Sequence, residues 1–93
     1  MTTESFDSVW DAIEDTPQEA AHMRIKSDLM IALTELIKSQ DWTQAQAAKQ
    51  LGVTQPRISD LMRGKISLFG IESLIGMLAI AGLEIDVSIR KAA

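Results

Sequence analysis

The side chains most able to recognise another molecule lie between Trp42 and Ile66. Gln55 and Arg57 follow Thr54, a residue type that commonly precedes the first turn of a helix. Glutamine and arginine at the start of a helix can form paired hydrogen bonds with adenine and guanine edges in the major groove of DNA. Four basic residues against one acidic residue give this stretch a net charge of +3, which suits a polyanion. The residue types therefore predict contact with double-stranded DNA.

Catalytic chemistry has no comparable support in the sequence. His22 is the only histidine, the chain has no cysteine, and no serine or lysine is evidently placed beside a base. The acidic residues that cluster do so near the N-terminus, where no rigid pocket is expected to tune a carboxyl group. No glycine-rich phosphate loop follows a strand. We therefore expect no enzyme, no catalytic residue, no metal site and no cofactor.

Helix-start and helix-stop signals divide most of the chain into helices. A threonine followed three residues later by glutamate or glutamine marks two helix starts, at Thr16 and Thr43. Gly52 ends the second of these helices, and Thr54 caps a third helix only two residues later. Gly64 closes the third helix. The predicted helices cover residues 17–39, 44–51, 55–63 and 70–81.

Two short helices joined by a tight glycine turn have the geometry of a helix-turn-helix, here at about residues 43–64. Gly52 permits the positive φ that such a turn needs, and Ala48 is small where the two helices would cross. A small core between these helices is expected from Ala47, Leu51, Val53, Ile58 and Leu61. On the third helix this leaves four residues exposed, Gln55, Arg57, Ser59 and Asp60.

A known family has a similar pattern. The helix-turn-helix of the Cro/phage-repressor family, also called the XRE family, resembles the stretch T-Q-A-Q-A-A-K-Q-L-G-V-T-Q-P-R-I-S-D-L-M-R-G-K. A longer stretch, most of residues 16–91, resembles the HigA-type antitoxins of bacterial toxin–antitoxin modules. Besides the helix-turn-helix, this stretch contains a long first helix, the sequence L-F-G-I-E-S-L and a terminal G-L-E-I-D-V-S-I-R. The resemblance implies an all-α, compact, lambda-repressor-like domain of four to five helices. It also implies a repressor that binds a palindromic DNA operator.

The resemblance assigns roles to individual residues at the start of each short helix. Gln44 begins the second helix, where the family uses a glutamine to hold a DNA phosphate. Thr54 and Gln55 fall where phage repressors place groove-facing residues, and Gln55 is the first candidate for a base contact. Pro56 stands where phage repressors often have a polar base reader, so it can offer only an apolar contact, for example to a thymine methyl.

Further along the third helix the sequence departs from the family's pattern at Asp60. Its carboxylate can accept a hydrogen bond from cytosine but repels phosphate, which leaves its role open. Arg57 can compensate, either as a base reader or as a phosphate clamp. Arg63 and Lys65, at the exit of the third helix, resemble the family's contacts with the DNA backbone.

The C-terminal part changes its period from helical to alternating. Apolar and polar residues take turns there, and the apolar ones are Leu83, Ile85, Val87 and Ile89. The alternation predicts one half-buried β-strand over residues 83–90, and no second strand pattern exists in the chain. Because a lone strand leaves a row of unpaired backbone groups, we expect it to pair with its own copy and build a homodimer.

Residues 1–15 are predicted to be a flexible acidic arm ahead of a domain over residues 16–91. The first 22 residues contain six acidic and no basic residues, a charge of −6, and Phe6, Trp10 and Ile13 recur there at helical spacing. Toxins paired with HigA-type proteins resemble RelE-like ribonucleases, which are basic because they hold RNA. An acidic arm with apolar side chains can cover such a surface. The alternatives are an arm that folds back on its own first helix and an arm that is only a solvated tail.

The leading interpretation is a repressor that is also an antitoxin and autoregulates its toxin–antitoxin operon. The alternatives are a free-standing phage-type regulator without a toxin partner and a pure protein-interaction module. No apolar run approaches the ~18 residues needed to cross a bilayer, and the acidic, polar start is unlike a signal peptide. We therefore expect a cytoplasmic protein without membrane contact.

Overall fold

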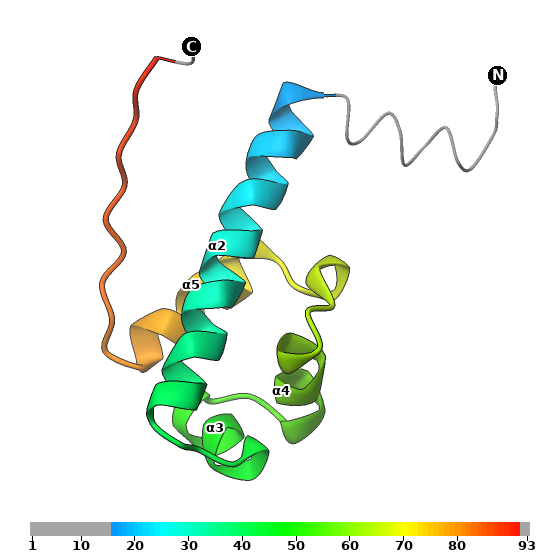
Figure 1. The fold of residues 1–93 in the computed structure, drawn as a ribbon, viewed down its shortest axis with the longest axis vertical. Coiled ribbons are helices and arrows are strands. Elements are labelled where there is room, and N and C mark those ends of the chain that lie inside the picture. Colours follow the sequence, from blue (N-terminus) through cyan, green and yellow to red (C-terminus); the bar gives the residue numbers. More distant parts are fainter. Residues whose placement is uncertain (1–15, 92–93) are drawn as a thin grey trace, which may run out of the picture.

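A computed structural model describes residues 16–91, and every regular element in that range is helical (Figure 1). The helices are α2 at Pro17–Ser39, α3 at Gln44–Leu51, α4 at Gln55–Met62 and α5 at Ile71–Ile80, with the short 3-10 helix η1 at Ile66–Leu68. These bounds confirm the all-α class and the four helices predicted from the capping signals. The one addition is η1, which lies between the third and fourth predicted helices.

The starts of α2, α3 and α4 follow from the threonines ahead of them. At α3 the full capping box forms: Thr43 Oγ1 accepts a hydrogen bond from Gln46 N at 3.1 Å, and Gln46 Oε1 accepts one from Thr43 N at 2.8 Å. Thr54 Oγ1 accepts from Arg57 N at the start of α4, at 3.4 Å, and Thr16 caps α2 in the same way. Caps of this kind typically stabilise a helix by about 1 kcal/mol each. The local sequence therefore decides where these helices begin.

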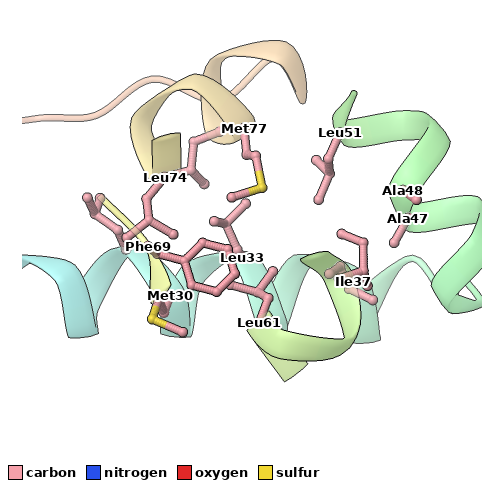
Figure 2. Packing of buried hydrophobic residues seen from close by; sticks show 13 residues of the cluster. Met30, Leu33, Ile37, Ala47, Ala48, Leu51, Leu61, Phe69, Leu74 and Met77 are labelled. Atoms are coloured by element: carbon pink, nitrogen blue, oxygen red, sulfur yellow. The ribbon is translucent and has the colours of Figure 1, made fainter. Parts of the chain in front are cut away.

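The core lies where α2 meets the other helices (Figure 2). α2 packs against α5 and α4, while α3 packs against α4 and α5. In Figure 2 the buried side chains of α2 (Met30, Leu33, Ile37) face those of α3, α4 and α5 (Leu51, Leu61, Leu74, Met77), with Phe69 among them. α2 and α5 therefore support the two short helices, because α4 packs on α2 and α3 packs on α5.

The C-terminal segment differs from its prediction. Residues 83–91 carry neither helix nor strand, and they leave α5 as an extended trace (Figure 1). Residues 16–91 contain no β-strand, so the strand expected over residues 83–90 is not found in the single chain. The physical reason is that alternation only specifies which side chains share a face. A strand also needs a neighbouring backbone to bond with, and the described part of the chain offers only helices.

The acidic arm, with Phe6, Trp10 and Ile13, lies outside the described residues. Within residues 16–91 no helix is long and apolar enough to cross a membrane. In the same range no three histidine or carboxylate side chains are grouped as a metal ion would require.

Candidate nucleic-acid interface

A tight turn sets the angle between α3 and α4. Gly52 has a φ of +71°, in the left-handed region, and its N–H donates to the carbonyl oxygen of Ala48. A Cβ atom at position 52 would lie 3.3 Å from Ile80 Cδ1 of α5. Glycine therefore meets two requirements here, because it adopts the left-handed conformation without strain and lets the turn approach α5 closely.

The small core predicted between α3 and α4 is confirmed. Ala47, Leu51, Ile58 and Leu61 are buried, and Val53 is partly buried against them. In α4 the buried pair Ile58 and Leu61 defines the inward direction. At about 100° of rotation per residue, the opposite, outward direction falls on Pro56, Ser59 and Asp60. The packing of two residues thus determines which side of α4 can meet a partner.

Most of the predicted contact residues are exposed. Gln55 and Pro56 are exposed in the first turn of α4, directly after the exposed cap residue Thr54. The other exposed members stand at the first position of α3 and just after α4, namely Gln44, Arg63 and Lys65. Both ends of α4 and the start of α3 therefore present polar or basic groups to solvent. Asp60 and Arg57 are half-buried.

Asp60 lies beside a cation. Its carboxylate Oδ1 is 3.9 Å from Lys65 Nζ, and the backbone N–H of Lys65 donates to the Asp60 carbonyl oxygen at 3.1 Å. Both side chains keep substantial exposure, so the ion pair adds little stability. Its local effect is electrostatic, because the lysine offsets negative charge on the outward side of α4.

Arg57 is engaged within the protein. Its Nη1 donates to the carbonyl oxygen of Leu68 at 2.7 Å, and its Nη2 donates to Ser73 Oγ at 3.5 Å. Its guanidinium carbon Cζ lies 4.1 Å from the centre of the Phe69 ring. The side chain thus crosses from α4 to η1 and the first turn of α5. The expected roles of Arg57 as base reader or phosphate clamp gain no support from this geometry.

Ser59, to which no functional role is assigned from the sequence, is half-buried and lies on the outward side of α4 with Pro56 and Asp60. The spacing of Ile58 and Leu61 indicates this side from the sequence alone. The partners of Arg57 carried no such signal. Leu68 and Ser73 lie 11 and 16 residues away in the sequence, and only the tertiary fold brings them to α4.

Comparison with known proteins agrees with this arrangement. A family profile described as a helix-turn-helix domain matches residues 12–90. No match among curated proteins is significant. A solved structure whose name assigns it to the XRE family of transcriptional regulators is similar with a TM-score of 0.72 and 32% sequence identity, over 80% of this chain and 83% of that chain. The chain therefore belongs to the XRE-type helix-turn-helix family, whose members are DNA-binding regulators and not enzymes.

Proposed function

We propose that this protein is a sequence-specific repressor that binds a palindromic operator as a homodimer. The observation that carries the proposal is the exposed first turn of α4, where Thr54, Gln55 and Pro56 stand on a helix held by a capped turn and a buried inner face. Helix-turn-helix proteins place the start of the second helix of the motif, which is α4 here, against base edges in the major groove. Gln55 offers both a donor and an acceptor, the combination that pairs with adenine.

Contacts with phosphates complement this readout. Arg63 and Lys65 are exposed directly after α4, and Gln44 is exposed in the first turn of α3. Backbone N–H groups at a helix start also favour an anion. Phosphate contacts orient a protein on the duplex without reading sequence, whereas base contacts supply the specificity. We assign positioning to these three residues and base reading to the start of α4.

Residues 83–90 supply the proposed dimer contact. Leu83, Ile85, Val87 and Ile89 are all exposed in the single chain, with Val87 at 76% and Ile89 at 90%. Pairing with a second copy would cover these side chains and satisfy the backbone groups of the segment. A two-fold arrangement would also hold two α4 helices about one turn of DNA apart, ~34 Å.

The register of this pairing follows from its chemistry. The apolar side chains share a face in both copies only if the two-fold axis passes through a residue. An axis through Asp86 would place two carboxylates opposite each other, which is unfavourable. An axis through Val87 places Ile85 opposite Ile89 and also brings Glu84 opposite an arginine, Arg90. We therefore propose Val87 as the centre.

We further infer that the repressor is the antitoxin of its own operon. The support is the resemblance of the wider frame to HigA-type antitoxins, together with the acidic residues near the N-terminus. A RelE-like ribonuclease is basic, so an acidic segment that carries Phe6, Trp10 and Ile13 is complementary to it in charge. A short basic reading frame beside this gene would favour the antitoxin over a free-standing regulator.

Footprinting of the promoter DNA upstream of the gene tests the repressor. We expect protection of two inverted half-sites whose centres lie about 10 base pairs apart or a multiple of that spacing. Protection of an unpaired site would contradict the dimer, and uniform coating of the DNA would contradict sequence-specific repression. For the antitoxin, co-purification of the adjacent gene product with this chain is the expected result.

A further inference from the structure

We propose that Arg57 is a positioning residue that holds α4 in register for base reading and does not itself contact DNA. The inference rests on the proposed function of α4. The term Arg57 clasp is used here for Arg57 with its three partners, Leu68, Phe69 and Ser73. The clasp joins the first turn of α4 to η1 and to the first turn of α5.

The location of the clasp gives it this role. The buried anchors of α4 are Ile58 and Leu61, and both lie beyond its first turn, where Gln55 stands. Arg57 extends the attachment into the first turn, because its backbone N–H donates to Thr54 Oγ1 while its guanidinium reaches a different part of the chain. The clasp therefore restrains the rotation and position of the turn from which Gln55 projects.

The second end of the clasp lies in the segment that follows α4. The carbonyl oxygen of Leu68 belongs to η1, three residues after Lys65, and the N–H of Leu68 donates to the Lys65 carbonyl oxygen at 3.0 Å. One guanidinium thus links the base-reading turn to the segment that carries a proposed phosphate contact. The distance between Gln55 and Lys65 determines whether both can meet the same duplex, and Arg57 helps to set that distance.

The chemistry of the clasp requires arginine in particular. A guanidinium is flat and carries its N–H donors in a fixed fork, so it can donate to Leu68 and Ser73 while its face lies on the Phe69 ring. Phe69 is buried, at 2% exposure, so its ring gives the cation a rigid platform. A lysine at position 57 keeps the charge but offers a single nitrogen. The Arg57→Lys substitution therefore removes the paired contacts of the clasp and keeps the positive charge.

DNA titrations of the full-length protein test the inference, at temperatures well below the melting point of each variant. The variants are Arg57→Lys, Arg57→Ala and Gln55→Ala, with Arg24→Ala as a matched control that removes an exposed arginine of α2. For Arg57→Lys we expect operator affinity to fall by about 5- to 150-fold, the range that one bidentate base contact supplies. Affinity for random DNA and the salt dependence should stay at the wild-type values for Arg57→Lys.

A double-mutant cycle identifies the residue through which Arg57 acts. If Arg57 positions Gln55, then Arg57→Lys should cost little further operator affinity in a protein that already carries Gln55→Ala. A purely structural role would lower the melting temperature and leave the ratio of operator to random-DNA affinity unchanged. The ratio and the cycle therefore respond to positioning and not to stability alone.

Other outcomes would overturn the inference. A phosphate clamp predicts that Arg57→Lys binds like wild type and that Arg57→Ala lowers the slope of log affinity against log salt by about 1. A base reader predicts additive losses with Gln55→Ala. If Gln55→Ala loses operator preference and Arg57→Lys keeps it, the clasp has no role in recognition but the proposed function stands. If the wild-type protein itself does not prefer the operator over random DNA, the inference about Arg57 and the proposed function both fail.

A spectroscopic measurement tests the clasp without DNA. In the free protein the Arg57 guanidinium signals should be shifted by the Phe69 ring current and protected from exchange with water. They should keep this signature in the operator complex. Loss of the ring-current shift on operator binding, with new contacts from Arg57 to a base, would show that the clasp opens and would contradict the inference.

Discussion

Gln55 begins α4 and Lys65 lies three residues beyond its end, and their chemistry differs in a way that binding measurements can separate. Gln55→Ala should weaken binding to the preferred operator by about 1–3 kcal/mol and relax the sequence preference at one base pair. The reason is that a base contact discriminates among sequences, whereas total charge does not change. Titration of the operator and of its single-base variants measures both effects.

Lys65→Ala is the contrasting control at the same scale. We expect it to lower affinity for every sequence to a similar extent and to reduce the salt slope by about 1, because a phosphate contact releases counterions wherever the protein binds. The lysine lies 3.9 Å from Asp60, so its removal also leaves that carboxylate without an offsetting charge. If both variants bound like wild type, the groove-facing side of α4 would be assigned wrongly.

At the scale of elements, the α3–α4 turn depends on one glycine. Gly52→Ala should destabilise the protein by about 1–2 kcal/mol, since an alanine pays that cost in the left-handed conformation. The new Cβ would also press on Ile80 at 3.3 Å. Urea unfolding measures the change in the free energy of unfolding.

Gly76→Ala in α5 is the matched control for the turn. Gly76 lies inside a helix, and a Cβ atom there would meet nothing within 4 Å. Alanine is favoured over glycine in a helix interior by about 0.5–1 kcal/mol, so this variant should be more stable than wild type. Equal destabilisation by the two substitutions would show that the turn has no special requirement for glycine.

The elements also show what sequence reasoning can and cannot reach. The starts of α3 and α4 could be predicted because Thr43 and Thr54 act on N–H groups within their own first turns. The inward side of α4 could be predicted from the periodicity of its apolar residues. The inward path of Arg57 could not, since it depends on Phe69 and Ser73 meeting α4 through tertiary packing. The strand predicted over residues 83–90 is not found in residues 16–91, because alternation alone supplies no neighbouring backbone for a strand to bond with.

At the scale of the whole molecule, the absence of native cysteine permits a direct test of the dimer. Val87→Cys should form a disulfide-linked dimer under mild oxidation, because a two-fold axis through position 87 would bring the two Cβ atoms to ~4.5–5.5 Å. Asp86→Cys is the control and should crosslink far less readily. Better crosslinking of Asp86→Cys would show that the two-fold axis passes through position 86 and not through position 87. If neither crosslinks while the protein is dimeric in solution, the dimer must use the helices.

The balance of charge over the whole chain gives a further prediction. A variant that begins at Thr16 loses five acidic residues and keeps nine basic and eight acidic ones, so its net charge changes from −4 to +1. It should bind its operator at least as tightly as the full chain, because it loses charge that repels phosphate. It should bind the adjacent gene product measurably more weakly by calorimetry. Unchanged affinity for that partner would show that the acidic segment is only a solvated tail.

Above all, we propose that this chain recognises a DNA sequence and not only the charge of DNA. The most direct measurement compares the affinity of the wild-type full-length protein for its own promoter with that for a shuffled duplex of the same length and composition, at one salt concentration. Specific regulators bind their operators roughly 10³ to 10⁷ times more tightly than other DNA, and a ratio in that range is the predicted result. Equal affinity for the two duplexes would contradict the account.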